Sequence, residues 1–307
     1  MTAVAAGANA RRGRPRLRRA AIGWVFVAPF AVLILVFVAG PVLASLAMSF
    51  TDLRSADLRD PLGVDWVGFA NFTKLFQDDL FLRSVVNTAL IVALGVPLTI
   101  GLGMAAAIGV NSGLTRFRSA FRVGYYMPVV TSIVAIAVVW RFLLQPDSGL
   151  INGLLRLIGI DGPNWLASTT WSLPTIIVMI VWRGLGFQMV IFLAGLQTIP
   201  QELYEAARVD GAGAWKQFRH VTLPSLRPTL LFASLIGTIG LLFVFEEPFV
   251  MTRGGPLNAT TTVSFHIYSQ FGFGNYGYAA AMSYALFIAV VLLSILQFRL
   301  LRTDEGR

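Results

Sequence analysis

The 307-residue chain is 56% hydrophobic and only 13% charged, and its mean hydropathy is +0.72. These values exclude an ordinary soluble globular protein and indicate a polytopic membrane protein, with length for six spans of about 20 residues plus loops. The net charge of +9 does not indicate nucleic-acid binding, because the basic residues gather at the ends of apolar segments, where they set membrane topology. Cysteine is absent, and His220 and His266 lie in predicted loops at opposite ends of the topology, so no metal site is expected.

The N-terminal third of the chain begins with a basic arm. Residues 1–20 carry six arginines and no acid, which predicts a disordered cytoplasmic arm at an anionic membrane surface. The apolar run at 21–50 is too long for a signal-peptide core and predicts an uncleaved first span. An external loop is predicted at 51–83, where aromatic and acidic residues are interleaved. The second span is predicted at 84–110, and its Gly95, Gly101, Gly103 and Gly109 indicate close helix packing.

The remaining apolar segments complete the predicted topology. A cytoplasmic loop at 111–122 leads to a third span at 123–144, in which Pro128 is a possible kink. An external loop at 145–171 includes a short amphipathic helix along the membrane. A fourth span is predicted at 172–198, a fifth at 228–251, a last external loop at 252–278 and a sixth span at 279–301. Residues 21–302 thus form one all-α domain of six transmembrane helices, followed by a short tail at 303–307.

Basic residues orient this topology. The segments predicted to be cytoplasmic, counted together with Arg299 at the inner end of the sixth span, hold sixteen lysines and arginines, and the three external loops hold six. Arg141 and Arg183 account for the remaining two and lie within spans. Because lysine and arginine are enriched in cytoplasmic loops, this asymmetry predicts that both termini and residues 199–227 lie in the cytoplasm.

The segment at 199–227 is a polar island between two long apolar runs. Two short helices are predicted at 201–209 and 214–222, with Asp210 and Gly211 in the turn, and the second helix is expected to end before Pro224. Gly211 permits a tight turn. The small side chains of Ala206 and Ala207 allow close backbone approach, while Glu205 offers a carboxylate to a partner. The segment is therefore a candidate docking surface.

The spacing within this segment resembles a known family motif. Glu205-Ala206-Ala207 is followed after three residues by Gly211, and after nine more by Val221-Thr222-Leu223-Pro224, as in the EAA loop of ABC importer permeases. Gly254-Gly255-Pro256 resembles a turn of the carbohydrate-type members. The resemblance assigns contact with an ATPase subunit to eight residues, namely Glu205, Ala206, Ala207, Asp210, Gly211, Val221, Leu223 and Pro224.

The resemblance also implies the fold and the partners. It implies a type I importer permease in the bacterial cytoplasmic (inner) membrane, paired with a second permease subunit, two ATP-binding cassette subunits and an extracytoplasmic solute-binding protein. The sequence has no Gly-Lys-Ser/Thr phosphate-binding loop, so ATP and Mg would be bound by the partner ATPase and no cofactor is expected in this chain. No convergent acid, base or nucleophile is found, so the chain is not expected to be an enzyme.

Ionisable residues within spans are costly and indicate function. Arg183 lies about 11 residues into the fourth span, roughly 16 Å deep, whereas Glu246 and Glu247 lie roughly 7 Å deep in the fifth. Pairing between these charges and contact with a solute both remain open. The charges within spans and the helix face of Arg183 predict that Arg183, Gln188, Glu246 and Glu247 lie on the solute pathway. The resemblance to maltose-type permeases adds Gly184, Phe187, Gly237, Leu241 and Val244, which makes nine residues. The sequence does not identify the solute.

A competing hypothesis is a secondary transporter that uses Arg183 with Glu246 and Glu247 as an ion relay. Such a protein has no use for a docking loop at 199–227. The spacing of that loop therefore favours the importer, in which the solute is a carbohydrate, a polyol or a glycerophospho compound.

Overall fold

The computed structural model describes residues 14–60, 63–111 and 118–301. Helices dominate these residues, and the one β-bridge pairs Thr51 with Trp66. In chain order the elements are α1 (Arg14–Ile34), η1 (Leu35–Ala39), α2 (Gly40–Ser49), η2 (Ser55–Arg59), α3 (Ala70–Leu75), α4 (Asp79–Asn111), α5 (Arg118–Val130), α6 (Ile133–Leu143), α7 (Leu150–Leu157), α8 (Ser172–Gln197), α9 (Gln201–Val209), α10 (Ala214–Gln217), η3 (Phe218–Thr222), α11 (Leu223–Ser225), α12 (Arg227–Leu242), α13 (Glu246–Met251), α14 (Val263–Gly272) and α15 (Tyr276–Leu301).

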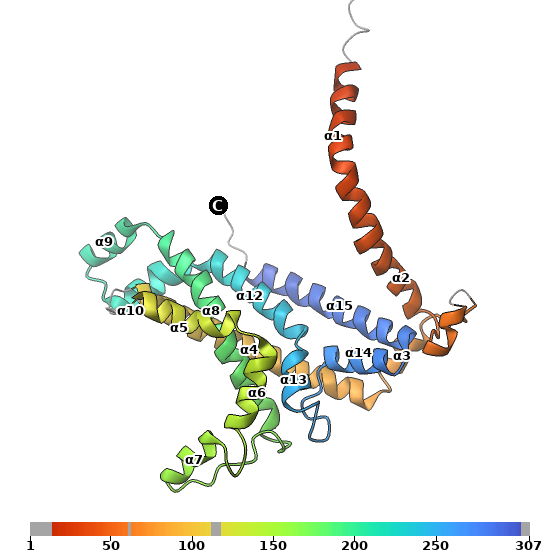
Figure 1. Ribbon diagram of the computed structural model, residues 1–307. Coiled ribbons are helices and arrows are strands. Elements are labelled where there is room, and N and C mark those ends of the chain that lie inside the picture. Colours follow the sequence, from red (N-terminus) through yellow and green to blue (C-terminus); the bar gives the residue numbers. More distant parts are fainter. Residues whose placement is uncertain (1–13, 61–62, 112–117, 302–307) are drawn as a thin grey trace, which may run out of the picture.

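The all-α fold and the membrane-spanning character are confirmed. Five helical segments are long and apolar enough to cross a membrane, and α5 with α6 makes a sixth if the bent pair is one span. The first span is α1–η1–α2, and Figure 1 shows α1 standing away from the other helices. None of the residues in its most apolar stretch is buried in the single chain. The prediction that residues 1–20 are disordered is wrong from Arg14 onward, because α1 begins there. The helix of the apolar run extends toward the N-terminus through arginines, which are good helix formers. Residues 1–13 and 302–307, and with them most of the arm and the tail at 303–307, lie outside the described part.

Two of the spans are broken. The third bends by 99° between α5 and α6, at Thr131 and Ser132, shortly after Pro128. The fifth is not the continuous helix expected, because α12 ends at Leu242 and α13 begins at Glu246. Pro248 has no N–H for the carbonyl of Val244, four residues earlier. That carbonyl instead accepts a hydrogen bond of 2.8 Å from the hydroxyl of Thr262, so the break is satisfied by a distant segment.

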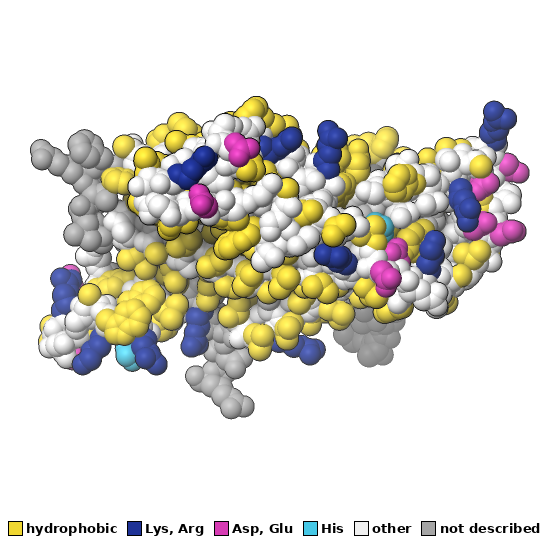
Figure 2. Space-filling model, turned by 90° about the horizontal axis from the view of Figure 1, so that it is seen from below, with side chains coloured by type: hydrophobic (Ala, Val, Ile, Leu, Met, Phe, Trp, Pro, Cys, Tyr) yellow, Lys and Arg dark blue, Asp and Glu magenta, His cyan; other side chains and the backbone are white. Residues whose placement is uncertain are grey.

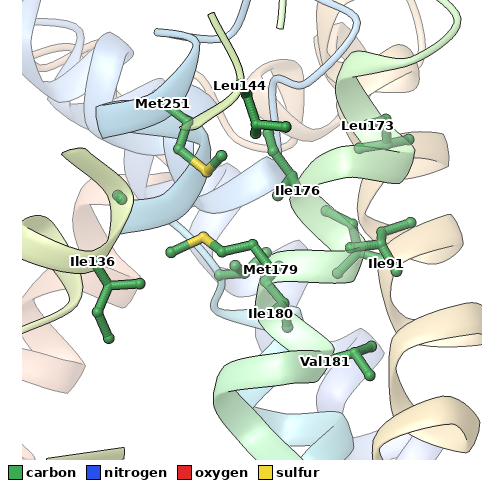
Figure 3. Packing of buried hydrophobic residues seen from close by; sticks show 12 residues of the cluster. Ile91, Ile136, Leu144, Leu173, Ile176, Met179, Ile180, Val181 and Met251 are labelled. Atoms are coloured by element: carbon green, nitrogen blue, oxygen red, sulfur yellow. The ribbon is translucent and has the colours of Figure 1, made fainter. Parts of the chain in front are cut away.

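The helix α8 forms the centre of the packed structure. Its residues Ile176 and Met179 are fully buried and pack with side chains from α4, α6 and α13, including Ile91, Ile136 and Met251 (Figure 3). A second cluster lies nearer the other end of α8, around Met189 and Phe192. This helix is the most buried of the spans, so it holds any residue it carries in a fixed position.

Small residues bring α4 close to its neighbours, as the spacing predicted. A Cβ added at Gly103 would lie 2.5 Å from the Cβ of Gln188 in α8, and one added at Gly95 would lie 2.7 Å from Leu241 in α12. Both glycines are buried. A Cβ added at Gly101 would meet no heavy atom within 4 Å, so only some of the glycines predicted to pack are used in packing within this chain.

The outer surface reflects the membrane environment. Figure 2 shows a broad apolar surface between groups of charged side chains toward the ends of the molecule. The amphipathic helix predicted in the third loop is α7, with Leu154 and Leu157 exposed. The helix α14 was not predicted, and it carries His266, which is 2% exposed and hydrogen-bonded to Asp78 rather than lying in a loop. His220 is exposed, in η3.

Candidate solute cavity and docking loop

A cavity of about 290 Å³ lies among α4, α5, α8, α12 and α13. All nine residues that sequence analysis placed on the solute pathway line it, and they come from α8, α12, α13 and the break between the last two. Seven further residues line it that sequence reasoning missed, namely Val96, Thr99, Val129, Ile180, Ile236, Gly240 and Phe243. Most of these are apolar and carry no signal that separates a cavity wall from a lipid-facing or packed position.

One ion pair crosses the cavity wall. The guanidinium Nη2 of Arg183 lies 3.6 Å from Oε1 of Glu247, and the two side chains are 30% and 5% exposed. This finding decides between the two glutamates left open by the sequence. Glu246 lies beside the pair but is exposed, and it makes no ion pair within the described residues. The break before α13 changes the path of the fifth span, so straight-helix depths do not apply to Glu247.

Gln188 is the polar residue buried most deeply in this wall. It is 4% exposed, and its Nε2 donates a hydrogen bond of 3.3 Å to the carbonyl of Ala233 in α12. Its Oε1 is buried without a hydrogen-bond partner in the described part of the chain. A buried acceptor without a donor is costly, so this atom is a position where a donor from water or a bound solute would be stabilised.

The polar island at residues 199–227 forms a helical hairpin, and its first helix and its turn agree with the sequence prediction. The first helix is α9, as expected, and Gly211 has a φ of +74°, the left-handed conformation that favours glycine. Its N–H donates to the carbonyl of Arg208 at 3.0 Å. The hydroxyls of Tyr204 and Thr222, 3.0 Å apart, join α9 to η3, a contact that the sequence did not indicate.

The end of the hairpin differs from the prediction. The second helix does not stop before Pro224, because α10 continues as the π-helix η3 and then as α11, which includes Pro224. Pro224 directly follows the π-helical stretch, in which the N–H of Leu223 donates to the carbonyl of Phe218, five residues earlier. Of the eight residues assigned to docking, Glu205, Ala206, Asp210, Gly211 and Pro224 are exposed, whereas Ala207, Val221 and Leu223 are half-buried.

The hairpin is connected directly to the cavity. The helix α8 carries Arg183 and Gln188 and ends at Gln197, four residues before α9 begins. On the other side, α11 leads into α12, which carries Gly237 and Leu241. Val221 and Tyr204 of the hairpin pack against the same cluster as Met189 and Phe192. A displacement of the hairpin would therefore be transmitted to two of the cavity walls.

Polar contacts fix the segments at the other end of the molecule. The side-chain amide of Asn87 in α4 donates to the carbonyls of Asn258 and Thr261, at 3.1 and 2.9 Å. The hydroxyl of Thr88 accepts from the N–H of Val263 at 3.0 Å. These bonds hold the loop that contains Gly254-Gly255-Pro256 against α4.

Asp78 joins three further elements. One carboxylate oxygen accepts from the N–H groups of Leu80 and Phe81 at the start of α4, and the other lies 2.7 Å from the Tyr278 hydroxyl and 3.2 Å from Nε2 of His266. Burial raises the pKa of Asp78, but the hydrogen bonds from Tyr278, Phe81 and His266 outweigh it and hold that pKa below its ordinary value. Sequence reasoning missed this cluster.

Comparison with known proteins identifies the class of molecule. Residues 98–303 match the family described as binding-protein-dependent transport system inner membrane component. The chain belongs to this family of permeases. The permease is 36% identical over 282 residues to the lactose transport system permease protein LacF of Rhizobium radiobacter, covering 90% of this chain and 92% of the relative. It is 35% identical to the diacetylchitobiose uptake system permease protein NgcF of Streptomyces coelicolor, covering 97% and 88%.

Solved structures agree with this assignment. A chain of a bacterial alginate ABC transporter, in complex with an alginate pentasaccharide-bound periplasmic protein, matches with a TM-score of 0.82 and 25% identity. The match covers 97% of this permease and 100% of that chain. The protein is thus a multi-pass membrane permease subunit of the sugar ABC importer type.

Proposed function

We propose that this permease couples ATP hydrolysis by a separate ATPase subunit to the import of a carbohydrate or related polyol or glycerophospho compound. The observation that carries the proposal is the continuity between the exposed hairpin at residues 199–227 and the cavity around Arg183 and Gln188. The hairpin docks on the ATPase, which binds ATP and Mg, and α8 and α12 transmit its displacement to the cavity.

The proposed assembly contains a second permease subunit, two ATPase subunits and an extracytoplasmic solute-binding protein, in a bacterial cytoplasmic membrane. Two observations support it. The relatives are permease proteins of uptake systems for lactose and diacetylchitobiose. In addition, the first span is almost wholly exposed and apolar in the single chain, which leaves a surface for lipid or a neighbouring subunit.

The nine residues common to the sequence hypothesis and the cavity wall are proposed to contact the solute during passage. A secondary transporter that uses Arg183 and Glu247 as an ion relay is the alternative. Co-purification separates the two hypotheses. The tagged permease, extracted with the proteins encoded beside it, should retain an ATP-binding cassette subunit and show ATP-dependent uptake in vesicles with its binding protein. Uptake that needs an ion gradient and no ATPase would reject the importer.

A further inference from the structure

The cavity wall carries an uneven set of charges. Only Arg183, Glu246 and Glu247 are ionisable among the residues that line the cavity. Arg183 is paired with Glu247, whose carboxylate oxygen lies 3.6 Å from the guanidinium. Glu246 has no such partner in the described part of the chain. Glu246 is therefore the one carboxylate among the lining residues that no ion pair within the described part of the chain offsets.

The unpaired atom of Gln188 supports the preference for solutes that carry hydroxyl groups. The orientation of its amide is fixed by Nε2, which donates to the carbonyl of Ala233, since a flipped amide would place two acceptor oxygens together. Oε1 is consequently an acceptor, it is buried, and no donor reaches it in the described residues. A hydroxyl or an ammonium group supplies a donor to this atom.

We propose that the cavity accepts neutral or cationic polyhydroxylated solutes and disfavours anionic ones, anionic glycerophospho compounds included, with Glu246 as the charge that determines this preference. The inference rests on the proposed function in that it takes the cavity as part of the solute pathway. An anion would lose its hydration and approach an unpaired carboxylate, whereas a cation would be concentrated there. A cleft with one sign of charge and low-dielectric walls changes local counter-ion concentrations by about tenfold or more.

The absence of cysteine from the sequence allows a direct test in the complete transporter. A cysteine is introduced by Gly240→Cys, because Gly240 lines the cavity and an added Cβ there meets no heavy atom within 4 Å. Gly272→Cys at the end of α14 is the control, since it is exposed, outside the cavity and equally free of steric conflict. Nanodisc samples are treated with trimethylammonium-ethyl or sulfonatoethyl methanethiosulfonate, and both labelling rates are measured by mass spectrometry.

The ratio of the cationic to the anionic rate, divided by the same ratio at the control, is expected to be about tenfold or more and to fall toward one when Glu246→Gln is added. A ratio near one with Glu246 present, or a high ratio that survives Glu246→Gln, would overturn the proposal. So would failure of both reagents at Gly240→Cys and at a second lining position, Val129→Cys. Labelling needs no ATP hydrolysis, so loss of coupling to an ATPase would overturn the proposed function and leave these rates unchanged.

Discussion

Arg183 in α8 and Glu247 in α13 form an ion pair of 3.6 Å across the wall of the cavity. In straight helices the two residues would differ in depth by about 9 Å. Glu247 lies in α13, just after the break that follows Leu242, and the carbonyl freed at Val244 accepts a hydrogen bond from Thr262. The ion pair and the broken span are therefore parts of one arrangement.

Removal of Arg183 and removal of Glu247 should destabilise the permease to different extents. Arg183→Leu leaves Glu247, which is 5% exposed, without a counter-ion, and we expect a loss of about 3 kcal/mol or more. Glu247→Leu leaves Arg183, which is 30% exposed, so its loss should be smaller. The double substitution should recover part of both losses in thermal unfolding of the purified transporter. Glu246→Leu is the control, because its loss of stability should simply add to that of Arg183→Leu. Losses that are strictly additive for Arg183→Leu and Glu247→Leu would contradict the ion pair.

The turn of the docking hairpin provides a matched pair of glycines. Gly211 has a φ of +74°, whereas Gly213 has a φ of −69° and an added Cβ there meets no heavy atom within 4 Å. Gly211→Pro is incompatible with that φ and removes the bond to Arg208, so ATP-dependent uptake should be abolished while the protein still reaches the membrane. Gly211→Ala should impair uptake partly, at a backbone cost of about 1–2 kcal/mol, and Gly213→Ala should not.

The docking role can be separated from the turn geometry by charge. Glu205 is exposed on α9, so Glu205→Lys should leave the hairpin folded while placing a cation against a partner that is proposed to offer a basic group. Uptake should be lost with membrane abundance unchanged. Glu202→Lys, an exposed change one turn earlier on the same helix, is the control. Equal effects of the two substitutions would show that overall charge, and not contact at Glu205, is responsible.

Topology remains a prediction from the distribution of basic residues. Fusions of alkaline phosphatase, which is active only outside the cytoplasm, should be inactive after Lys216 and Arg307 and active after Asn164 and Gly272. The last two positions lie in loops with one basic residue each. Strong activity after Lys216 would place the docking hairpin on the wrong side for an ATPase and would contradict the importer mechanism.

Sequence reasoning succeeded where the signal is local. The bounds of α8 and α9 follow from apolar runs and from Pro200 between them, and Gly211 indicates its own turn. Sequence reasoning failed where the structure at a residue depends on a contact with a residue distant in the chain. The break after Leu242 depends on Thr262, and the burial of His266 depends on Asp78, which lies 188 positions away. Arg183, Glu246 and Glu247 were placed on the cavity by their charge within spans, Gln188 by helical spacing and the other five by family resemblance. The seven lining residues that were missed have no local pattern that distinguishes them.

The last prediction concerns Asp78. Because its pKa is lower in the folded protein than its ordinary value, folding favours the ionised form. Its contribution to stability is therefore complete above that ordinary value, about 3.9, and is lost as the pH falls through the lower folded value. Asp78→Ala, which also removes the cap of α4, should lower stability at pH 7 by about 1 kcal/mol or more.

Asp78→Asn separates the charge from the cap. Its amide oxygen can still accept from Leu80 and Phe81, so it should lose less stability than Asp78→Ala, and its loss should come from the contacts with His266 and Tyr278. Thermal unfolding of the purified transporter between pH 3 and pH 7 measures both effects. The difference between the original protein and Asp78→Asn should shrink toward the acidic end of that range, because protonated aspartic acid and asparagine are then both uncharged. A difference that stays constant, or grows, as the pH falls would show that the carboxylate charge does not stabilise the junction of α4, α14 and α15.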